Sequence, residues 1–258
     1  MHRGCFVLKA TEREQKIIGL LESRGEIPVA QLSDILGVSV STLRKQLAVM
    51  CAKGLVIRTY GGVMSINRVP DETFESKLYK NESEKKKIAE CARKMVTQGA
   101  SIALGSGTTV FALGSLLSDL AHGTVYTNSM QTADHLSHYV GPEVHICGGI
   151  IRSHTGTLIG SEVVEYFRSL KPVDYAFISC DAIDGDGAVF SENLSVATVE
   201  KTILLCAKKK YILCDSSKIG RTAVGHIINL KECDGLITCR SNEKMVDHYQ
   251  YLTNVFYA

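Results

Sequence analysis

Residues 101–109 read Ser-Ile-Ala-Leu-Gly-Ser-Gly-Thr-Thr, and this stretch decides the fold class of the larger part of the chain. The apolar run from Ser101 to Leu104 predicts a short buried strand, and Thr108 opens a predicted helix. The glycines between them allow backbone N–H groups to approach an anion closely, and the amino end of a helix favours negative charge. The stretch therefore predicts a strand, a loop and a helix that together cradle a phosphate group.

The candidate phosphate ligands are backbone N–H groups and hydroxyls of five consecutive residues, namely Gly105, Ser106, Gly107, Thr108 and Thr109. Their pattern is neither a Walker A loop nor the G-x-G-x-x-G of dinucleotide-binding folds, so the sequence does not indicate a nucleotide. A plain turn between strand and helix, with the threonines as capping residues, is the alternative interpretation.

Strands and helices alternate along the rest of the chain. Apolar runs predict strands at 101–104, 124–127, 144–147, 175–179, 211–214 and 236–238, and helical spacing predicts helices from 83, from 108 and at 131–138, 162–170 and 195–208. This alternation is typical of a mostly parallel sheet with helices on both faces, so we expect an α/β fold. Ligands of such sheets bind beyond the carboxyl ends of the strands.

Polar or small residues follow three more of these strands. Asn128, with Ser129 beside it, is placed to bind a sugar hydroxyl, although it equally suits the cap of the next helix. Gly148 and Gly149 either leave room for a ligand or form a simple turn. Lys218 is placed to neutralise a phosphate, and a solvated lysine is the alternative.

The length of 258 residues suits two domains. Residues 10–65 predict a small helical domain that ends in a hairpin. Residues 66–82 have no clear period and include Pro70, so they predict a linker. Residues 83–258 form the second domain and carry the alternation of strands and helices.

The small domain has the pattern of a helix-turn-helix at residues 27–46. Gly37 breaks its second helix, and Ser39 is placed to cap a third helix. Leu43, Leu47 and Met50 recur at i, i+4 and i+7 and therefore face inward. In a helix-turn-helix the second helix of the motif enters the major groove. Its candidate DNA contacts are the polar residues of the cap and first turns, namely Ser39, Ser41, Thr42, Arg44 and Lys45.

A wing is predicted after this helix, because a short strand leads into a turn at residues 58–63. Arg58 and Tyr60 are expected against the sugar-phosphate backbone of DNA. Residues 1–64 hold nine Lys or Arg against five Asp or Glu, a net charge of +4 in a chain whose total is +2. A basic domain suits DNA, but a solvated basic face on a packing module is the alternative.

Two runs in this domain resemble the DeoR-type helix-turn-helix. The family pattern V-S-x-x-T-I-R-R-D-L is similar to residues 38–47, and G-x-x-x-R-x-x-G-G is similar to residues 54–62. Leu43, Lys45 and Gln46 replace the Ile, Arg and Asp of the pattern, and Lys is not equivalent to Arg at a bidentate contact, so operator preference is expected to differ. The resemblance implies a transcription repressor that binds double-stranded operator DNA.

The larger domain resembles the DeoR sensor domain over about residues 75–240. The family segments D-x-G-T-T, T-N-S, G-G and D-x-S-K-x-G are similar to residues 105–109, 127–129, 148–149 and 215–220. Gly105 replaces the first Asp and Cys239 replaces the Asp of a closing I-T-D, so a carboxylate suited to a sugar hydroxyl is missing. The resemblance implies a fold like ribose-5-phosphate isomerase and control of a carbohydrate-metabolism operon by a phosphorylated sugar.

Composition adds several expected absences. Nine cysteines without a C-x-x-C spacing suggest buried thiols rather than a metal site, and no cofactor is expected. No apolar run approaches the roughly 20 residues that span a bilayer, and no secretory signal is recognisable, so we expect no membrane partner and a cytoplasmic protein. One recognition helix reads few base pairs, so a homo-oligomer, dimer or tetramer, is expected.

Two other functions remain open. Asp181, Asp184 and Glu200 offer the carboxylates that a sugar-phosphate isomerase needs to move a proton. The Gly-rich Lys segment that precedes the Glu of that enzyme is missing, so we expect no catalysis, and an isomerase-like enzyme with a DNA-binding head is the alternative. In the third interpretation the larger domain senses no small molecule and only oligomerises.

Overall fold

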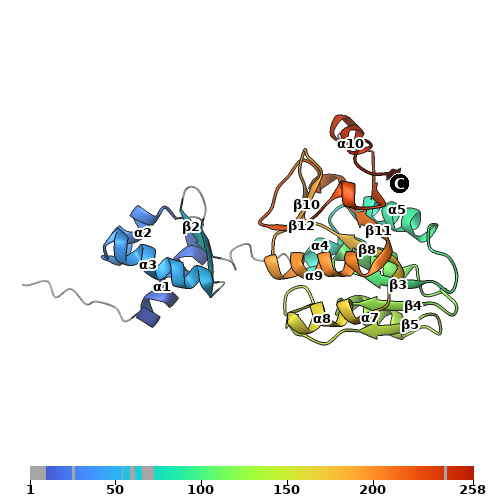
Figure 1. The fold of residues 1–258 in the computed structure, drawn as a ribbon, viewed down its shortest axis with the longest axis horizontal. Coiled ribbons are helices and arrows are strands. Elements are labelled where there is room, and N and C mark those ends of the chain that lie inside the picture. Colours follow the sequence, from blue (N-terminus) through green and yellow to red (C-terminus); the bar gives the residue numbers. More distant parts are fainter. Residues whose placement is uncertain (1–9, 25–26, 54, 59–61, 66–72, 241–242) are drawn as a thin grey trace, which may run out of the picture. The chain divides into compact units, whose positions relative to one another are not determined.

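A computed structural model describes the chain except for residues 1–9, 25–26, 54, 59–61, 66–72 and 241–242. The chain divides into two compact units, Met1–Asp71 and Glu72–Ala258 (Figure 1). Each unit has a hydrophobic core of its own.

The first unit is a winged helix-turn-helix, as its sequence predicts. It contains α1 (Ala10–Arg24), α2 (Val29–Leu36), α3 (Val40–Ala52) and the antiparallel strands β1 (Val56–Arg58) and β2 (Val63–Ser65). Leu43, Leu47 and Met50 of α3 are fully buried, which confirms their inward orientation. They pack with residues of α1, α2, the hairpin and the segment that precedes α2, namely Ile17, Leu21, Ile27, Leu32, Val56 and Val63.

A glycine makes the turn between α2 and α3. Gly37 has a φ of 64°, in the left-handed region that favours glycine, and its N–H contacts the carbonyls of Ser33 and Asp34. The helices on either side meet at 108°, within the range typical of a helix-turn-helix.

The second unit is an α/β domain with a parallel seven-stranded sheet of order β14-β13-β11-β8-β3-β4-β5. In chain order its first half contains α4 (Phe74–Leu78), α5 (Glu82–Arg93), β3 (Ser101–Leu104), α6 (Thr108–Ser115), β4 (Thr124–Thr127), α7 (Met130–Ser137), β5 (Glu143–Ile146), β6 (Ile150–Arg152), β7 (Thr157–Ile159), α8 (Ser161–Ser169) and β8 (Val173–Ser179). The remainder contains β9 (Ala182–Ile183), β10 (Ala188–Ser191), α9 (Leu194–Leu205), β11 (Ala207–Leu213), η1 (Ser216–Lys218), β12 (Gly225–Asn229), η2 (Leu230–Glu232), β13 (Gly235–Thr238), α10 (Glu243–Tyr249) and β14 (Val255–Tyr257).

Both faces of this sheet are covered, because successive strand residues point to opposite sides. Ala103 of β3 packs in one core, to which α8 and α9 contribute Phe167 and Ile203. Its neighbours Ile102 and Leu104 pack in the other core, which contains buried residues of α5, α6 and α7. The mostly parallel, doubly covered sheet that the apolar strands predict is therefore confirmed.

The structure differs from the sequence-based expectation in several places, among them α10 and β14, which follow the last predicted strand. Antiparallel pairs β6–β7 and β9–β10–β12 decorate the parallel sheet, and they were not expected. Helix α9 ends at Leu205 instead of residue 208, because Ala207 already pairs with Val173 in the sheet. Part of the segment expected to be a linker, residues 66–82, is folded: α4 packs Phe74 edge-on against Phe111 of α6.

Among the described residues no single helix is long and apolar enough to cross a membrane. The one helix pair that meets the length and composition criteria together is α2 and α3, which is sharply bent.

Candidate DNA-binding and effector sites

The amino end of α3 presents a linked group of hydroxyls. Ser39 caps the helix, and its Oγ accepts a hydrogen bond from the N–H of Thr42 at 3.3 Å. The same Oγ lies 3.0 Å from the Ser41 hydroxyl and 2.9 Å from the Thr42 hydroxyl. All three side chains are exposed, so the cap that starts the helix also forms a polar tip that can meet a phosphate or a base edge.

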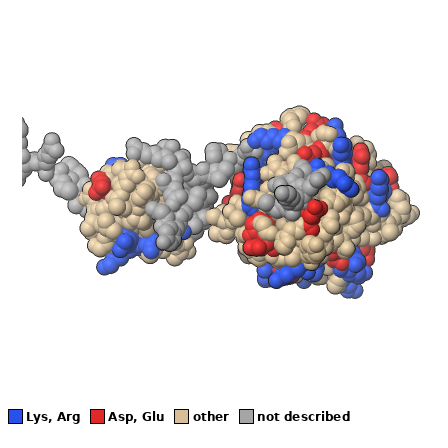
Figure 2. Space-filling view, turned by 90° about the horizontal axis from the view of Figure 1, so that it is seen from above, with Lys and Arg blue, Asp and Glu red and all other residues tan. Residues whose placement is uncertain are grey.

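Arg44 and Lys45 are exposed on the same turn of α3, as expected. Arg58 of β1 has an additional role that the sequence did not predict, because its Nη2 donates to the carbonyl of Arg44 at 2.8 Å. This bond ties the wing strand to the recognition helix. Tyr60 lies outside the described residues. Figure 2 shows the visible Lys and Arg side chains of this unit mostly gathered in one area, whereas both charges mix on the second unit.

Gln46, which stands where the family pattern has Asp, is bonded within the unit. Its Oε1 accepts a hydrogen bond from Nη1 of Arg13, a largely buried residue of α1, at 3.1 Å. The replacement therefore retains an acceptor that connects α1 to α3, and it contributes to the packing of the unit.

The predicted phosphate loop follows β3 at the carboxyl edge of the sheet and opens α6. Ser106, Thr108 and Thr109 are buried. Gly107 has a φ of 100°, and a Cβ at this position would lie 2.4 Å from Oγ of Ser179, so only glycine fits. Ser179, at the end of the neighbouring β8, donates to the carbonyl of Ser106 at 3.0 Å and fixes the loop from the side.

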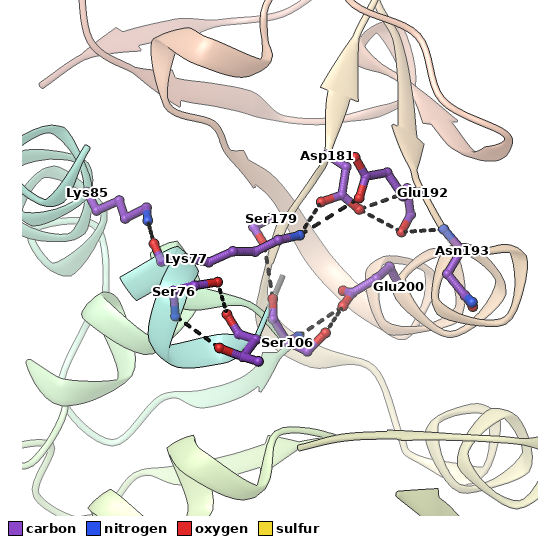
Figure 3. Close-up of polar contacts among 11 residues, drawn as sticks. Ser76, Lys77, Lys85, Ser106, Ser179, Asp181, Glu192, Asn193 and Glu200 are labelled. Carbon is purple, nitrogen blue, oxygen red and sulfur yellow. Dashed lines mark hydrogen bonds and ion pairs between the residues drawn. The ribbon is translucent and has the colours of Figure 1, made fainter. Parts of the chain in front are cut away.

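A buried carboxylate from α9 also holds this loop. Oε1 of Glu200 accepts hydrogen bonds from the N–H of Ser106 at 2.9 Å and from its hydroxyl at 2.8 Å (Figure 3). Glu200 is only 2% exposed. Burial and, to a smaller extent, the nearby charge of Asp181 raise its pKa to about 7, against the opposing effect of the two Ser106 bonds. The sequence signal was a carboxylate within the otherwise apolar buried stripe of this helix.

An ion pair also lies at this edge of the sheet, and the sequence did not predict it. Nζ of Lys77 in α4 lies 3.2 Å from Oδ1 of Asp181, just after β8, and 4.0 Å from Oε2 of Glu192 (Figure 3). Oδ2 of Asp181 accepts hydrogen bonds from the Ser191 hydroxyl and the Glu192 N–H, both at 3.0 Å. Lys77 sits in the stretch interpreted as linker, where no motif marks it.

More cations surround Asp181. Burial by itself would raise the pKa of Asp181, but Lys77, the Glu192 N–H, Lys218 and Ser191 together hold it below its ordinary value. Burial lowers the pKa of Arg152 at the end of β6, and Asp181 opposes that shift. Lys218, predicted from the sequence, therefore acts at the same place as Lys77 and Arg152.

The loop that carries Lys218 is fixed from α5. Glu84 accepts hydrogen bonds from the N–H and the hydroxyl of Ser216, both at 2.8 Å. Asn81 donates to Asp215 at 2.9 Å. Asp215 is therefore a structural residue of the loop, and the charge available to a ligand there is that of Lys218.

The segment after β4 is fully buried. Nδ2 of Asn128 donates to the Leu158 carbonyl at 3.2 Å, while its Oδ1 has no hydrogen-bond partner among the described residues. Ser129, and not Asn128, caps the next helix, since its Oγ accepts from the Thr132 N–H at 3.2 Å. Asn128 therefore has an acceptor oxygen that no described residue uses.

Gly148 and Gly149 form the exposed turn from β5 to β6. A Cβ on Gly149, whose φ is 133°, would lie 2.7 Å from the carbonyl of Ile159, so packing alone accounts for that glycine. Gly148 has open space around it. The structure therefore fits both a turn that leaves room for a ligand and a simple connecting turn.

The three acids of the isomerase alternative are not equivalent. Asp181 and Glu200 lie at the loop edge. Asp184 accepts the backbone N–H groups of Asp186 and Ala188 in the β9–β10 turn, and so serves the turn. Among the described residues, no group of three or more His, Cys, Asp or Glu is arranged to hold a metal ion.

Comparison with known families assigns both units. Residues 13–69 match the DeoR-like helix-turn-helix domain, and residues 80–240 match the DeoR C terminal sensor domain. The chain belongs to the DeoR family of transcriptional regulators. This DeoR-family chain therefore combines a DNA-binding helix-turn-helix with a sensor domain.

Curated relatives of this DeoR-family chain span nearly its whole length. The HTH-type transcriptional repressor CsqR of Escherichia coli K12 is 29% identical, covering 90% of this chain and 88% of that protein. The lactose phosphotransferase system repressor of Streptococcus mutans is 31% identical, covering 92% and 96%. The glycerol-3-phosphate regulon repressor of Haemophilus influenzae is 26% identical, covering 93% and 94%.

Solved structures of another class share part of the fold. Ribose 5-phosphate isomerase A from Methanocaldococcus jannaschii is 23% identical, with a TM-score of 0.40 and coverage of 54% of this chain and 55% of that one. A likeness of this size carries no argument about function.

Proposed function

We propose that this chain represses a carbohydrate-metabolism operon and that a phosphorylated sugar, bound at the carboxyl edge of the sensor sheet, controls its binding to operator DNA. The observation that carries the proposal is the convergence of anion-binding groups at that edge. A glycine loop at a helix N-terminus lies at the same edge as a cluster of Lys77, Arg152 and Lys218 around the half-buried carboxylate of Asp181. The repressor names of two relatives, for lactose and for glycerol 3-phosphate, support the carbohydrate class.

In this proposal the phosphate lies over the loop of residues 105–109. The first N–H groups of α6 have no carbonyl partners within the helix and point to that side. Lys218 neutralises part of the charge, and the free Oδ1 of Asn128 accepts a hydrogen bond from a sugar hydroxyl. The unphosphorylated sugar is expected to bind far more weakly, because most of these groups act on the phosphate.

Helix α4 is the proposed link between the effector and the DNA-binding unit. It is the first element of the second unit and therefore the one nearest in sequence to the first unit. Its Lys77 is held by Asp181, within the effector site. A bound phosphate competes with Asp181 for that ammonium and so changes how α4 is held. Binding that favours one state of α4 is what regulation requires.

The test is a pair of titrations of the full chain with a panel of sugar phosphates, with and without DNA from upstream of its own operon. Linkage requires that the sugar phosphate change DNA affinity by the factor by which DNA changes sugar-phosphate affinity. Equal ligand affinity in both titrations would exclude control by that sugar. DNA binding itself should weaken steeply as salt rises, because phosphate contacts release counterions.

An isomerase-like activity is the second candidate, favoured by the pKa of about 7 for Glu200, which suits a general base. The assay is incubation with ribose 5-phosphate followed by measurement of ketose. No ketose formation, together with a DNA response to the same compound, would support the regulator alone.

A further inference from the structure

Glu200 fills the place next to the loop that a side chain at position 105 would need. A Cβ added to Gly105 would lie 2.0 Å from Oε2 of Glu200, far inside any real contact. The DeoR family pattern described above has Asp at this position. In this chain the carboxylate beside the loop comes from α9, and only a glycine at position 105 leaves room for it.

This carboxylate already occupies part of the predicted anion site. Both donors of Ser106, its N–H and its hydroxyl, are bonded to Oε1 of Glu200 (Figure 3). Consecutive residues lie about 3.8 Å apart and each hydrogen bond adds about 2.9 Å, so an anion on the next amide of the loop lies within roughly 10 Å of the Glu200 carboxylate. Two negative charges at this separation repel strongly where water is excluded.

The second oxygen of Glu200 lacks a partner. Oε2 is buried and has no hydrogen-bond partner among the described residues. A buried polar atom without a hydrogen bond is unusual, so a partner other than the described residues is expected for Oε2. A proton shared with a bound anion satisfies this carboxylate and removes the repulsion in one step.

The charged groups around Glu200 do not neutralise it. Asp181, from the segment after β8, raises its pKa. Lys77 of α4 is turned to Asp181 and Glu192, and Lys218 and Arg152 also act on Asp181. The direct hydrogen bonds to Glu200 come from Ser106 alone among the described contacts.

We propose that Glu200 makes the loop selective for phosphate groups over sulfate groups, because a bound phosphate shares a proton with this carboxylate. A phosphate monoester has its second pKa near 6, so its dianion readily takes up one proton from solution when it binds beside a carboxylate at neutral pH, and inorganic phosphate carries a proton of its own there. A sulfate group stays fully deprotonated there and binds only if Glu200 itself takes up a proton. This inference rests on the proposed function, and it names the residue that selects the anion.

The experiment is isothermal titration calorimetry of the full chain with inorganic phosphate and with sulfate, in two buffers of different ionisation enthalpy. The difference between the buffers gives the protons taken up on binding. Glu200→Gln retains an oxygen for Ser106 but cannot ionise. Glu165→Gln, at an exposed site on α8, is the matched control. The pH dependence of binding is measured with sulfate, because phosphate itself changes protonation state in the pH range of the experiment.

We expect the wild type and the control variant to prefer phosphate by at least about tenfold at pH 8.5, where sulfate binding must protonate Glu200 and phosphate binding makes a charge-assisted hydrogen bond to it. Sulfate should bind more tightly as the pH falls from 8.5 to 6, with uptake of about one proton at the upper end. Glu200→Gln should bind both ions alike, without proton uptake and without a pH dependence.

Two results would overturn the inference while the proposed function stands: equal binding of both ions by the wild type without proton uptake, or an unchanged phosphate preference in Glu200→Gln. The wild-type measurement decides even if the variant does not fold. If neither ion binds either protein between pH 6 and 8.5, the loop is not an anion site, and the proposed effector site fails with the inference.

Discussion

Lys77 and Asp181, 104 positions apart in the chain, meet at 3.2 Å and join α4 to the carboxyl end of β8. The pair lies at the edge of the sheet where the glycine loop opens α6, and neither partner is fully exposed. Because α4 is the first element of the second unit, this contact joins the beginning of that unit to the sheet edge where the effector site is proposed.

Lys77→Ala should uncouple operator binding from sugar-phosphate binding. Without the ammonium, α4 loses its hold on Asp181 whether or not a ligand is present, so operator affinity should respond to sugar phosphate at least about tenfold less than in the wild type. The measurement is fluorescence anisotropy of labelled operator across a ligand series. Lys171→Ala, an exposed lysine at the opposite edge of β8, is the control. An undiminished response in Lys77→Ala would remove α4 from the coupling.

Lys218→Ala should weaken the sugar phosphate itself. One charge-assisted contact to a phosphate is lost, which corresponds to about 1.5–3 kcal/mol, or roughly ten- to a hundredfold in affinity. DNA affinity in the absence of ligand should stay as in the wild type. Calorimetric titration with the sugar phosphate and with operator DNA measures these two affinities. An unchanged ligand affinity would exclude Lys218 from the site and leave the loop proposal standing.

Glu200 should make the folded chain less stable as the pH rises. Its folded pKa of about 7 lies above the ordinary 4.5, so between these values the folded state keeps a proton that the unfolded state has released. The free energy of unfolding therefore falls with rising pH across this window, by about 3 kcal/mol from this group. Urea denaturation of the wild type and Glu200→Gln at a series of pH values should show a flatter dependence in the variant. Parallel curves would mean that Glu200 does not titrate there.

Arg44→Ala and Arg58→Ala should change DNA binding in different ways. Arg44 is exposed on the recognition helix, so its loss should relax sequence preference at one position, by about 1–3 kcal/mol if it contacts a guanine. Arg58 is bonded to the Arg44 carbonyl, so its loss should weaken binding to all sequences and loosen the wing. Titrations with operator and with random DNA separate the two. Identical behaviour on both DNAs would show that this division of roles is wrong.

The oligomeric state is a separate prediction. A single α3 reads few base pairs, and two-fold operators usually match two-fold proteins, so at least a dimer is expected on DNA. Light scattering at the protein concentration that saturates operator is the measurement, and a monomer there would contradict the expectation.

Local sequence was sufficient for the elements and for much of the site. Apolar runs located the strands, because a parallel sheet covered on both faces must be apolar along its whole strands. Gly37 and Ser39 marked the turn and the cap of α3, since a left-handed φ and a side-chain acceptor are requirements of single positions. The loop at residues 105–109 was visible for the same reason.

Tertiary structure decided which distant side chains share the site. Lys77 lies in a short helix without a motif, and only the fold brings it to Asp181. Glu200 lies 94 positions from Ser106, and its meeting with the loop depends on the packing of α9 against the sheet. By itself the sequence determined the elements, the loop and the family resemblance, because these depend on residues close in the chain. The charges at the site depend on long-range packing and on burial, and only the tertiary structure sets those.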